Sequence, residues 1–83
     1  MIEYQSILND IYAGLTEITK GRFDINEQSQ LIEQLNLDSL QIMGLILDIE
    51  DHFDISIPVN VLKDVKTVKD LVIQIEKLSR DEG

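Results

Sequence analysis

Few side chains in this 83-residue chain could do chemistry, because it contains one histidine and no cysteine. The only pair that suggests nucleophilic catalysis is Ser39 with His52, 13 residues apart on one expected helix. That spacing separates them by about 20 Å along the helix axis and turns them to different faces. A hydrolase built on Ser39 is therefore strongly disfavoured, and His52 is expected to be a capping or surface residue at a helix end.

A metal site is the next chemical possibility, since four acidic residues follow one another closely between positions 48 and 54. Their spacing does not fit a calcium loop, because Phe53 stands where that loop requires glycine and no bidentate glutamate follows. Zinc-ligand clusters, phosphate-binding glycine loops and nucleophile elbows are also missing from the sequence. The sequence therefore predicts neither a metal site nor a catalytic residue.

Ser39 remains as a candidate for modification rather than catalysis. It follows Asp38, which is placed to cap a helix while Gln41 reaches back to complete a capping box. The amides of a first helical turn and the helix dipole favour a phosphate group attached to such a hydroxyl. A serine at such a position is more often an ordinary first-turn residue. A modified serine and an unmodified one therefore both stay open at this point.

The elements that must position Ser39 are helical. Apolar residues recur at i, i+3, i+4 and i+7 over residues 2–19, which predicts a helix. Lys20 and Gly21 follow it and provide a signal for its C-terminal end. The same periodicity continues in the helix that Asp38 opens, which is expected to end near His52. A short helix is expected from Val59 to Val65. Thr67 is expected to cap a last helix, one side of which is lined by Val68, Leu71, Val72, Ile75 and Leu78.

The connections between these helices differ in character. Residues 21–37 carry too many apolar side chains for a solvated linker, so this loop is expected to pack on the helices, with a helical turn after Asn26 or Ser29. Residues 54–57 alternate like a strand but have no partner and end at Pro58. The sequence predicts an all-α fold, a small four-helix bundle with a long first loop and a short third helix. Residues 1–83 form a single domain, with residues 79–83 as a frayed C-terminal tail.

The second helix is apolar on two sides. Its core face is expected to consist of Ile42, Leu45, Ile46, Ile49 and Phe53. A second apolar stripe on the other side consists of Leu40, Met43 and Leu47, flanked by Glu50, Asp51 and Asp54. So small a domain can hardly bury a helix on both sides, so the second stripe is expected to contact a partner.

Charge is distributed unevenly along the chain. The formal net charge is -9, and residues 23–62 contain eight acidic residues and no lysine or arginine. Such a field repels nucleic-acid phosphates and anionic lipid, and it accelerates encounter with basic partners. No apolar run approaches the length of a membrane span, and the chain lacks cysteine. We expect a cytoplasmic monomer that binds no nucleic acid.

Several short motifs then carry a family resemblance. They are Leu35-Asn36-Leu37-Asp38-Ser39-Leu40, the helix end Glu50-Asp51-His52-Phe53-Asp54-Ile55, Ile57-Pro58 and Val65-Lys66-Thr67-Val68. Together they resemble the acyl carrier protein family, with the clearest match over residues 31–78. Asp-Ser-Leu alone is a weak motif, whereas the whole set at this spacing is specific.

The resemblance implies that Ser39, between Asp38 and Leu40, receives 4'-phosphopantetheine from coenzyme A through a phosphopantetheinyl transferase. The arm then carries acyl groups as thioesters, and the partner enzymes supply the catalysis. The second stripe and its acids become the docking face for acyl-loading and acyl-processing enzymes with basic patches. Residues suggested to line a cavity for the cargo are Ile42, Ile46, Ile57, Leu62 and Val65.

Three positions depart from the family pattern. Gln41 and Gly44 stand where carriers of primary fatty-acid synthesis usually have acids, and Asn36 stands where many have glycine. A carrier of a specialised acyl, polyketide or peptide pathway therefore stays open beside fatty-acid synthesis. The alternatives are an aminoacyl or peptidyl carrier, although Asp38 before Ser39 favours the acyl type, and an unmodified acidic adaptor.

Overall fold

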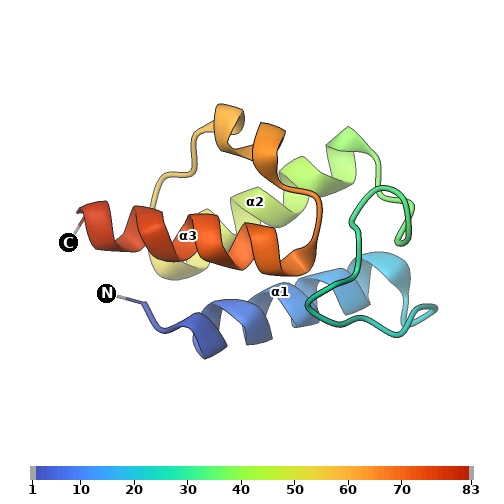
Figure 1. Cartoon of the computed structure of the whole chain (residues 1–83). Helices are drawn as coiled ribbons and strands as arrows, with labels where there is room; N and C mark the ends of the chain where they lie inside the picture. Colours follow the sequence, from blue (N-terminus) through green and yellow to red (C-terminus); the bar gives the residue numbers. More distant parts are fainter. Residues whose placement is uncertain (1, 83) are drawn as a thin grey trace.

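The computed structural model describes residues 2–82, and all its regular elements are helical (Figure 1). The elements are α1 (Tyr4–Thr19), α2 (Ser39–Phe53), the 3-10 helix η1 (Val59–Asp64) and α3 (Val68–Glu82). Within these residues the only β-type pairing is one isolated bridge between Gln30 and Thr67. The prediction of an all-α fold with a long first loop and a short third helix is confirmed.

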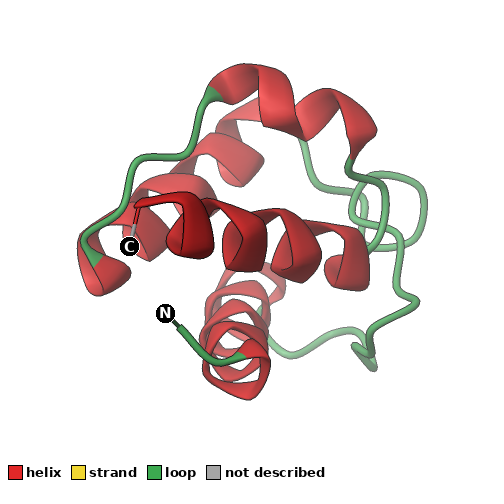
Figure 2. Cartoon of the chain, turned by 60° about the vertical axis from the view of Figure 1, so that its left-hand side comes forward, coloured by secondary structure: helices red, strands yellow, loops and turns green. Residues whose placement is uncertain are grey.

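The first helix is the centre of the packing. It contacts both α2 and α3, and the chain runs along α1 in the opposite direction to the other two long helices (Figure 1). The 3-10 helix packs on α3 only, and both views show η1 and α1 on opposite sides of α3 (Figures 1 and 2). One side of α2 is thus covered by α1, whereas η1 makes no comparable contact with α2 within residues 2–82.

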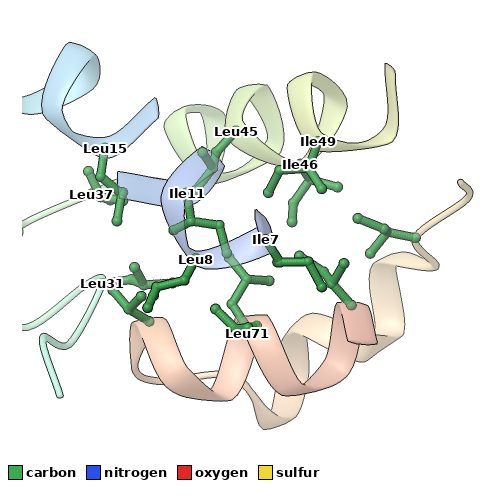
Figure 3. Packing of buried hydrophobic residues seen from close by; sticks show 14 of the residues in the cluster. Ile7, Leu8, Ile11, Leu15, Leu31, Leu37, Leu45, Ile46, Ile49 and Leu71 are labelled. Atoms are coloured by element: carbon green, nitrogen blue, oxygen red, sulfur yellow. The ribbon is translucent and has the colours of Figure 1, made fainter. Parts of the chain in front are cut away.

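The core is built from one face of each long helix, three leucines of the first loop, and Ile57 in the segment that follows α2. Figure 3 shows Ile7 and Ile11 of α1 between the ribbons of α2 and α3. Apolar side chains removed from water in this way provide the main stabilisation of the fold. The buried apolar residues are Ile7, Leu8, Ile11, Leu15, Leu31, Leu35, Leu37, Leu45, Ile46, Ile49, Ile57, Val68, Leu71, Val72 and Ile75. Ile42, Phe53 and Leu78, expected in the core, are half-buried at its margin.

The first loop is attached to the beginning of α3 by its backbone. The first amides of a helix have no intrahelical partner. Here the amide of Val68 donates to the carbonyl of Ser29 at 3.0 Å, and the carbonyl of Lys66 accepts from the amide of Leu31 at 2.9 Å. The expected helical turn after Ser29 is present, since the amide of Gln34 donates to the carbonyl of Gln30 at 3.0 Å. The loop is therefore part of the folded domain.

A side-chain hydrogen bond ties the same loop to α1. The Tyr4 hydroxyl donates to Oε1 of Glu27 at 2.5 Å. Burial of the ring and the adjacent Glu27 carboxylate raise the pKa of Tyr4 to about 12. The loop is thus held both to the start of α3 and to α1.

Two helix boundaries differ from the sequence prediction. The first helix begins at Tyr4 rather than near residue 2, and it ends at Thr19 as expected, with Lys20 in the left-handed conformation at φ 58°. The last helix continues to Glu82, so residues 79–82, predicted to be a frayed tail, are helical in this structure. Ser79 is buried, and its hydroxyl accepts a hydrogen bond from the amide of Ile2 at 3.1 Å, which fixes this turn. Gly83 lies outside the described residues.

Candidate functional site

The start of α2 is defined by a reciprocal capping box. Oδ1 of Asp38 accepts from the amide of Gln41 at 2.8 Å, and Oε1 of Gln41 accepts from the amide of Asp38 at 3.0 Å. Asn36 takes the left-handed conformation, with φ 58°, and turns the chain into this cap. The capping box predicted from the sequence is confirmed. The box makes Ser39 the first residue of the helix.

Ser39 is exposed, and no hydrogen bond within residues 2–82 engages its hydroxyl. His52 is occupied elsewhere: its Nδ1 lies 2.7 Å from Oδ1 of Asp10 on α1, and its ring lies against Phe53. It therefore offers no base to the serine, and the expectation of a surface residue at the helix end is confirmed. In the described part of the chain, no three His, Cys, Asp or Glu side chains are grouped to hold a metal ion.

An apolar cavity of about 250 Å³ opens beside Ser39, between α2, the first loop and η1. Its lining residues are Leu31, Ile32, Ser39, Ile42, Met43, Val59, Leu62 and Val65. Ile42, Leu62 and Val65 were expected from the sequence. Ile46 and Ile57 are not among the lining residues; both are buried in the core instead, where Ile46 shares the buried face of α2 with Leu45 and Ile49.

The apolar lining residues that sequence reasoning did not assign to this cavity are Leu31, Ile32, Val59 and Met43, the last of which was expected only on the docking face. The first two belong to the loop whose high apolar content was noticed without assigning its side chains to sides. Ile32 is 62% exposed although its neighbour Leu31 is buried, so adjacent loop residues serve different environments. Only the path of the loop across the molecule separates these roles.

The outer stripe of α2 lies where the periodicity placed it. Leu40 is 82% and Leu47 59% exposed, whereas Met43 is half-buried and lines the cavity. Asp51 and Asp54 are exposed at the far end of the helix, where Asp54 takes the left-handed conformation that ends it. From Ser39 to Leu47 the helix carries no charged side chain. The stripe therefore has an apolar end near the serine and an acidic end away from it.

Glu50 was expected on the docking face with these acids, but its carboxylate forms a hydrogen bond within the protein. It is half-buried, and its Oε2 accepts from the amide of Ile57 at 2.6 Å. This bond joins α2 to the extended segment that leads into η1. Its carboxylate is therefore less accessible to a partner than those of Asp51 and Asp54.

Comparisons with known proteins agree with this geometry. A family model described as the phosphopantetheine attachment site matches residues 7–75. An acyl carrier protein from Helicobacter hepaticus is 42% identical over 53 residues, covering 64% of this chain and 70% of that protein. Another, from Exiguobacterium sibiricum, is 34% identical over 73 residues, covering 87% and 92%. The chain belongs to the acyl carrier protein family.

A solved structure supports the same assignment at the level of the fold. It was assigned as an acyl carrier protein from Mycobacterium tuberculosis, and it matches with a TM-score of 0.76 at 30% identity, covering 86% of this chain and 96% of that one. Phosphopantetheine-binding domains of this family carry covalently attached 4'-phosphopantetheine, and the family interacts with phosphopantetheinyl transferases and acyl-processing enzymes. No helix within residues 2–82 is long and apolar enough to cross a bilayer.

The residues present fit such a group. An attachment point needs an accessible hydroxyl, and Ser39 is exposed and not hydrogen-bonded within residues 2–82. A phosphodiester is favoured at the first turn of a helix, where amides lack intrahelical partners. The carboxylate of Asp38 is held by the Gln41 amide. An apolar cavity lies directly beside this serine.

Proposed function

We propose that this carrier protein is modified at Ser39, carries acyl groups there without catalytic activity of its own, and presents them to enzymes of fatty-acid or polyketide-type biosynthesis. The observation that carries the proposal is the exposed hydroxyl of Ser39 at the mouth of an apolar cavity. When attached, 4'-phosphopantetheine supplies the thiol that the chain itself lacks and on which acyl groups are held as thioesters. The cytoplasmic compartment and the monomeric state stay predictions.

The residues of the chain itself position the attachment site and bind the cargo and the partner enzymes. Asp38 and Gln41 hold the first turn of α2 so that the Ser39 hydroxyl stays exposed to an incoming transferase. The cavity walls remove apolar parts of a cargo from water, worth roughly 25 cal/mol per Å² of buried area. Leu40, Met43 and Leu47 form the apolar part of the docking face, and Asp51 and Asp54 attract basic patches.

A specialised acyl or polyketide pathway is favoured over primary fatty-acid synthesis. The support is the uncharged first half of α2, with Gln41 and Gly44 where fatty-acid carriers usually have acids. Partner enzymes that act at Ser39 would then contact an apolar start of α2. A basic patch on such an enzyme would meet acidic side chains only at the far end of α2. An aminoacyl carrier would be revealed by an amino acid as the activated cargo.

Intact-protein mass spectrometry tests the attachment. The protein is incubated with coenzyme A and a broad-specificity phosphopantetheinyl transferase, beside Ser39→Ala and Ser6→Ala, which removes another exposed serine. We expect the wild type and Ser6→Ala to gain one phosphopantetheine and Ser39→Ala to gain none. A folded wild-type protein that gains no mass would contradict the proposal and favour an adaptor.

The docking face is tested by the salt dependence of the same reaction. Exposed charges lose their attraction as salt rises, because the Debye length shortens to about 3 Å at 1 M. We expect the kcat/KM of the transferase to fall with salt, and to fall less in the double variant Asp51→Asn with Asp54→Asn. A matched variant with Asp24→Asn and Glu33→Gln, acids of the first loop, should keep the wild-type slope.

A further inference from the structure

A hollow separate from the cavity beside Ser39 lies between the end of α1, the first loop and the start of α2. This Arg22 hollow has a volume of about 230 Å³, and it shares no lining residue with the Ser39 cavity. Two of its lining residues, Leu37 and Gln41, stand two positions before and two positions after Ser39. The hollow therefore lies within about one helical turn of the attachment site along the chain.

The Arg22 hollow combines buried apolar residues with exposed hydrogen-bond donors. Leu35 and Leu37 are buried in its lining, whereas Arg22, Asn36 and Gln41 are exposed. Among the described residues, no aspartate or glutamate lines the hollow. A guanidinium fork matches the geometry of a carboxylate, and carboxamide nitrogens also donate to it. The lining therefore fits a carboxylate on a short apolar stem, as in a glutamate side chain.

The guanidinium of Arg22 is held through one nitrogen and available through the other two. Its Nε donates to the carbonyl of Thr19 at 3.1 Å, and Oγ1 of Thr19 donates to the carbonyl of Leu15 at 2.8 Å. No hydrogen bond or ion pair within residues 2–82 engages the terminal nitrogens of Arg22, although Asp24 stands two residues away. A group that is already held in place loses less entropy when it binds a partner.

The capping box orients a second donor of the same hollow. Oε1 of Gln41 accepts from the amide of Asp38 at 3.0 Å, which leaves Nε2 as a donor without a partner in the described part of the chain. The same box makes Ser39 the first residue of α2. The donors of the Arg22 hollow and the attachment hydroxyl are therefore carried by one fixed segment.

Charges of opposite sign stand at the two ends of α2. Arg22 is the only lysine or arginine in residues 21–62, and it lines the hollow at the helix start. Asp51 and Asp54 are exposed at the far end, and no charged residue stands between Ser39 and Leu47. A complementary partner surface places an acid near Ser39 and a basic patch at the far end. A basic patch at the Ser39 end would meet Arg22, so the reversed orientation is disfavoured.

The partner that must come closest to this hollow is the phosphopantetheinyl transferase. It acts on the hydroxyl of Ser39 itself, whereas acyl-processing enzymes act on a thiol at the end of the attached arm. We infer that a glutamate or aspartate side chain of the transferase binds in the Arg22 hollow. Its carboxylate contacts the guanidinium, and its stem lies against the ring of Phe23, which is 42% exposed. The inference rests on the proposed attachment at Ser39 and makes Arg22 a docking residue for that reaction.

Modification kinetics with coenzyme A and the transferase of the same organism test the inference. Arg22→Gln should lower kcat/KM roughly two- to fivefold, the range of an exposed ion pair, by raising KM rather than lowering kcat. Arg22→Glu should lower it further, because two carboxylates would then face each other. Lys20→Gln and Lys20→Glu make the same changes in net charge at an exposed residue that does not line the hollow, and they should stay close to the wild type.

Charge reversal on the transferase separates docking from a structural role of Arg22. Each exposed aspartate and glutamate around its active site is replaced by lysine, and one replacement should restore the kcat/KM of Arg22→Glu while lowering that of the wild type. Loss of the bond to Thr19 alone would lower stability in urea and could not be rescued from the transferase. Equal kinetics of Arg22→Glu and Lys20→Glu, or the absence of a rescuing replacement, would overturn the inference. A wild-type protein that gains no phosphopantetheine would instead count against the proposed function.

Discussion

On its inner side α2 presents Leu45 and Ile49 to α1, and each is at most 1% exposed, whereas on its outer side Leu40 is 82% exposed. Both sides carry an apolar stripe in the sequence. The difference is that α1 covers the first side, while η1 packs on α3 and makes no comparable contact with α2 within residues 2–82. An apolar stripe is thus a core only where another element covers it, and the uncovered stripe adjoins the Ser39 cavity.

The largest expected effect compares one residue from each side. Ile49→Ala should lower the free energy of unfolding by about 2–5 kcal/mol, because it leaves a cavity where no water enters. Leu47→Ala, two positions away on the exposed side, should change it by less than about 0.5 kcal/mol. Urea denaturation measures both. Similar losses in the two variants would mean that the outer side is also covered.

Two glycines sharpen the same contrast. A Cβ at Gly14 of α1 would lie 2.6 Å from Cδ1 of Leu45, whereas a Cβ at Gly44 of α2 would meet nothing within 4 Å. Gly44→Ala should therefore stabilise the protein by about 1 kcal/mol through helix propensity. In Gly14→Ala that gain is offset by overpacking, about 1–3 kcal/mol. Thermal unfolding should rank Gly44→Ala above the wild type and Gly14→Ala below Gly44→Ala; the reverse order would contradict this packing.

The exposed start of α2 depends on its cap rather than on packing. Asp38→Ala removes the acceptor of the Gln41 amide and should cost about 1 kcal/mol. Asp38→Asn keeps an acceptor and should retain most of that stability. Urea denaturation measures the loss, and the transferase reaction shows whether a frayed first turn slows modification of Ser39. An unchanged free energy of unfolding in Asp38→Ala would show that the box is not stabilising.

The smallest expected effect is the pH dependence of the stability that Asp70 contributes at the start of α3. Hydrogen bonds from the amides of Lys66 and Thr67 hold the pKa of Asp70 below its ordinary value of 3.8. Its contribution to stability is therefore complete above that value and is lost as the pH falls through the lowered pKa. The stability gap between wild type and Asp70→Asn should be constant at neutral pH and shrink below about pH 4. A gap that persists at lower pH would contradict the assignment.

Much of this molecule could be predicted because the relevant signals are local. Asp38 and Gln41 are three residues apart, so the cap of α2 follows from their types alone. The inner and outer stripes of α2 follow from a period of 3.6 residues. Boundaries were less accurate where a distant partner intervened. The C-terminal turn at Ser79, expected to fray, is held by Ile2 from the other end of the chain.

By itself, the sequence determined the helical architecture, the exposed serine at a helix start, the uneven charge and the family. Only the tertiary structure decided that Leu31, Ile32 and Val59 line a cavity beside Ser39. Only the tertiary structure showed that Glu50, expected on a docking face from the sequence, accepts a hydrogen bond from the amide of Ile57. The physical reason is separation along the chain: periodicity and caps act within one or two turns, whereas these contacts form between segments that only the packed core brings together.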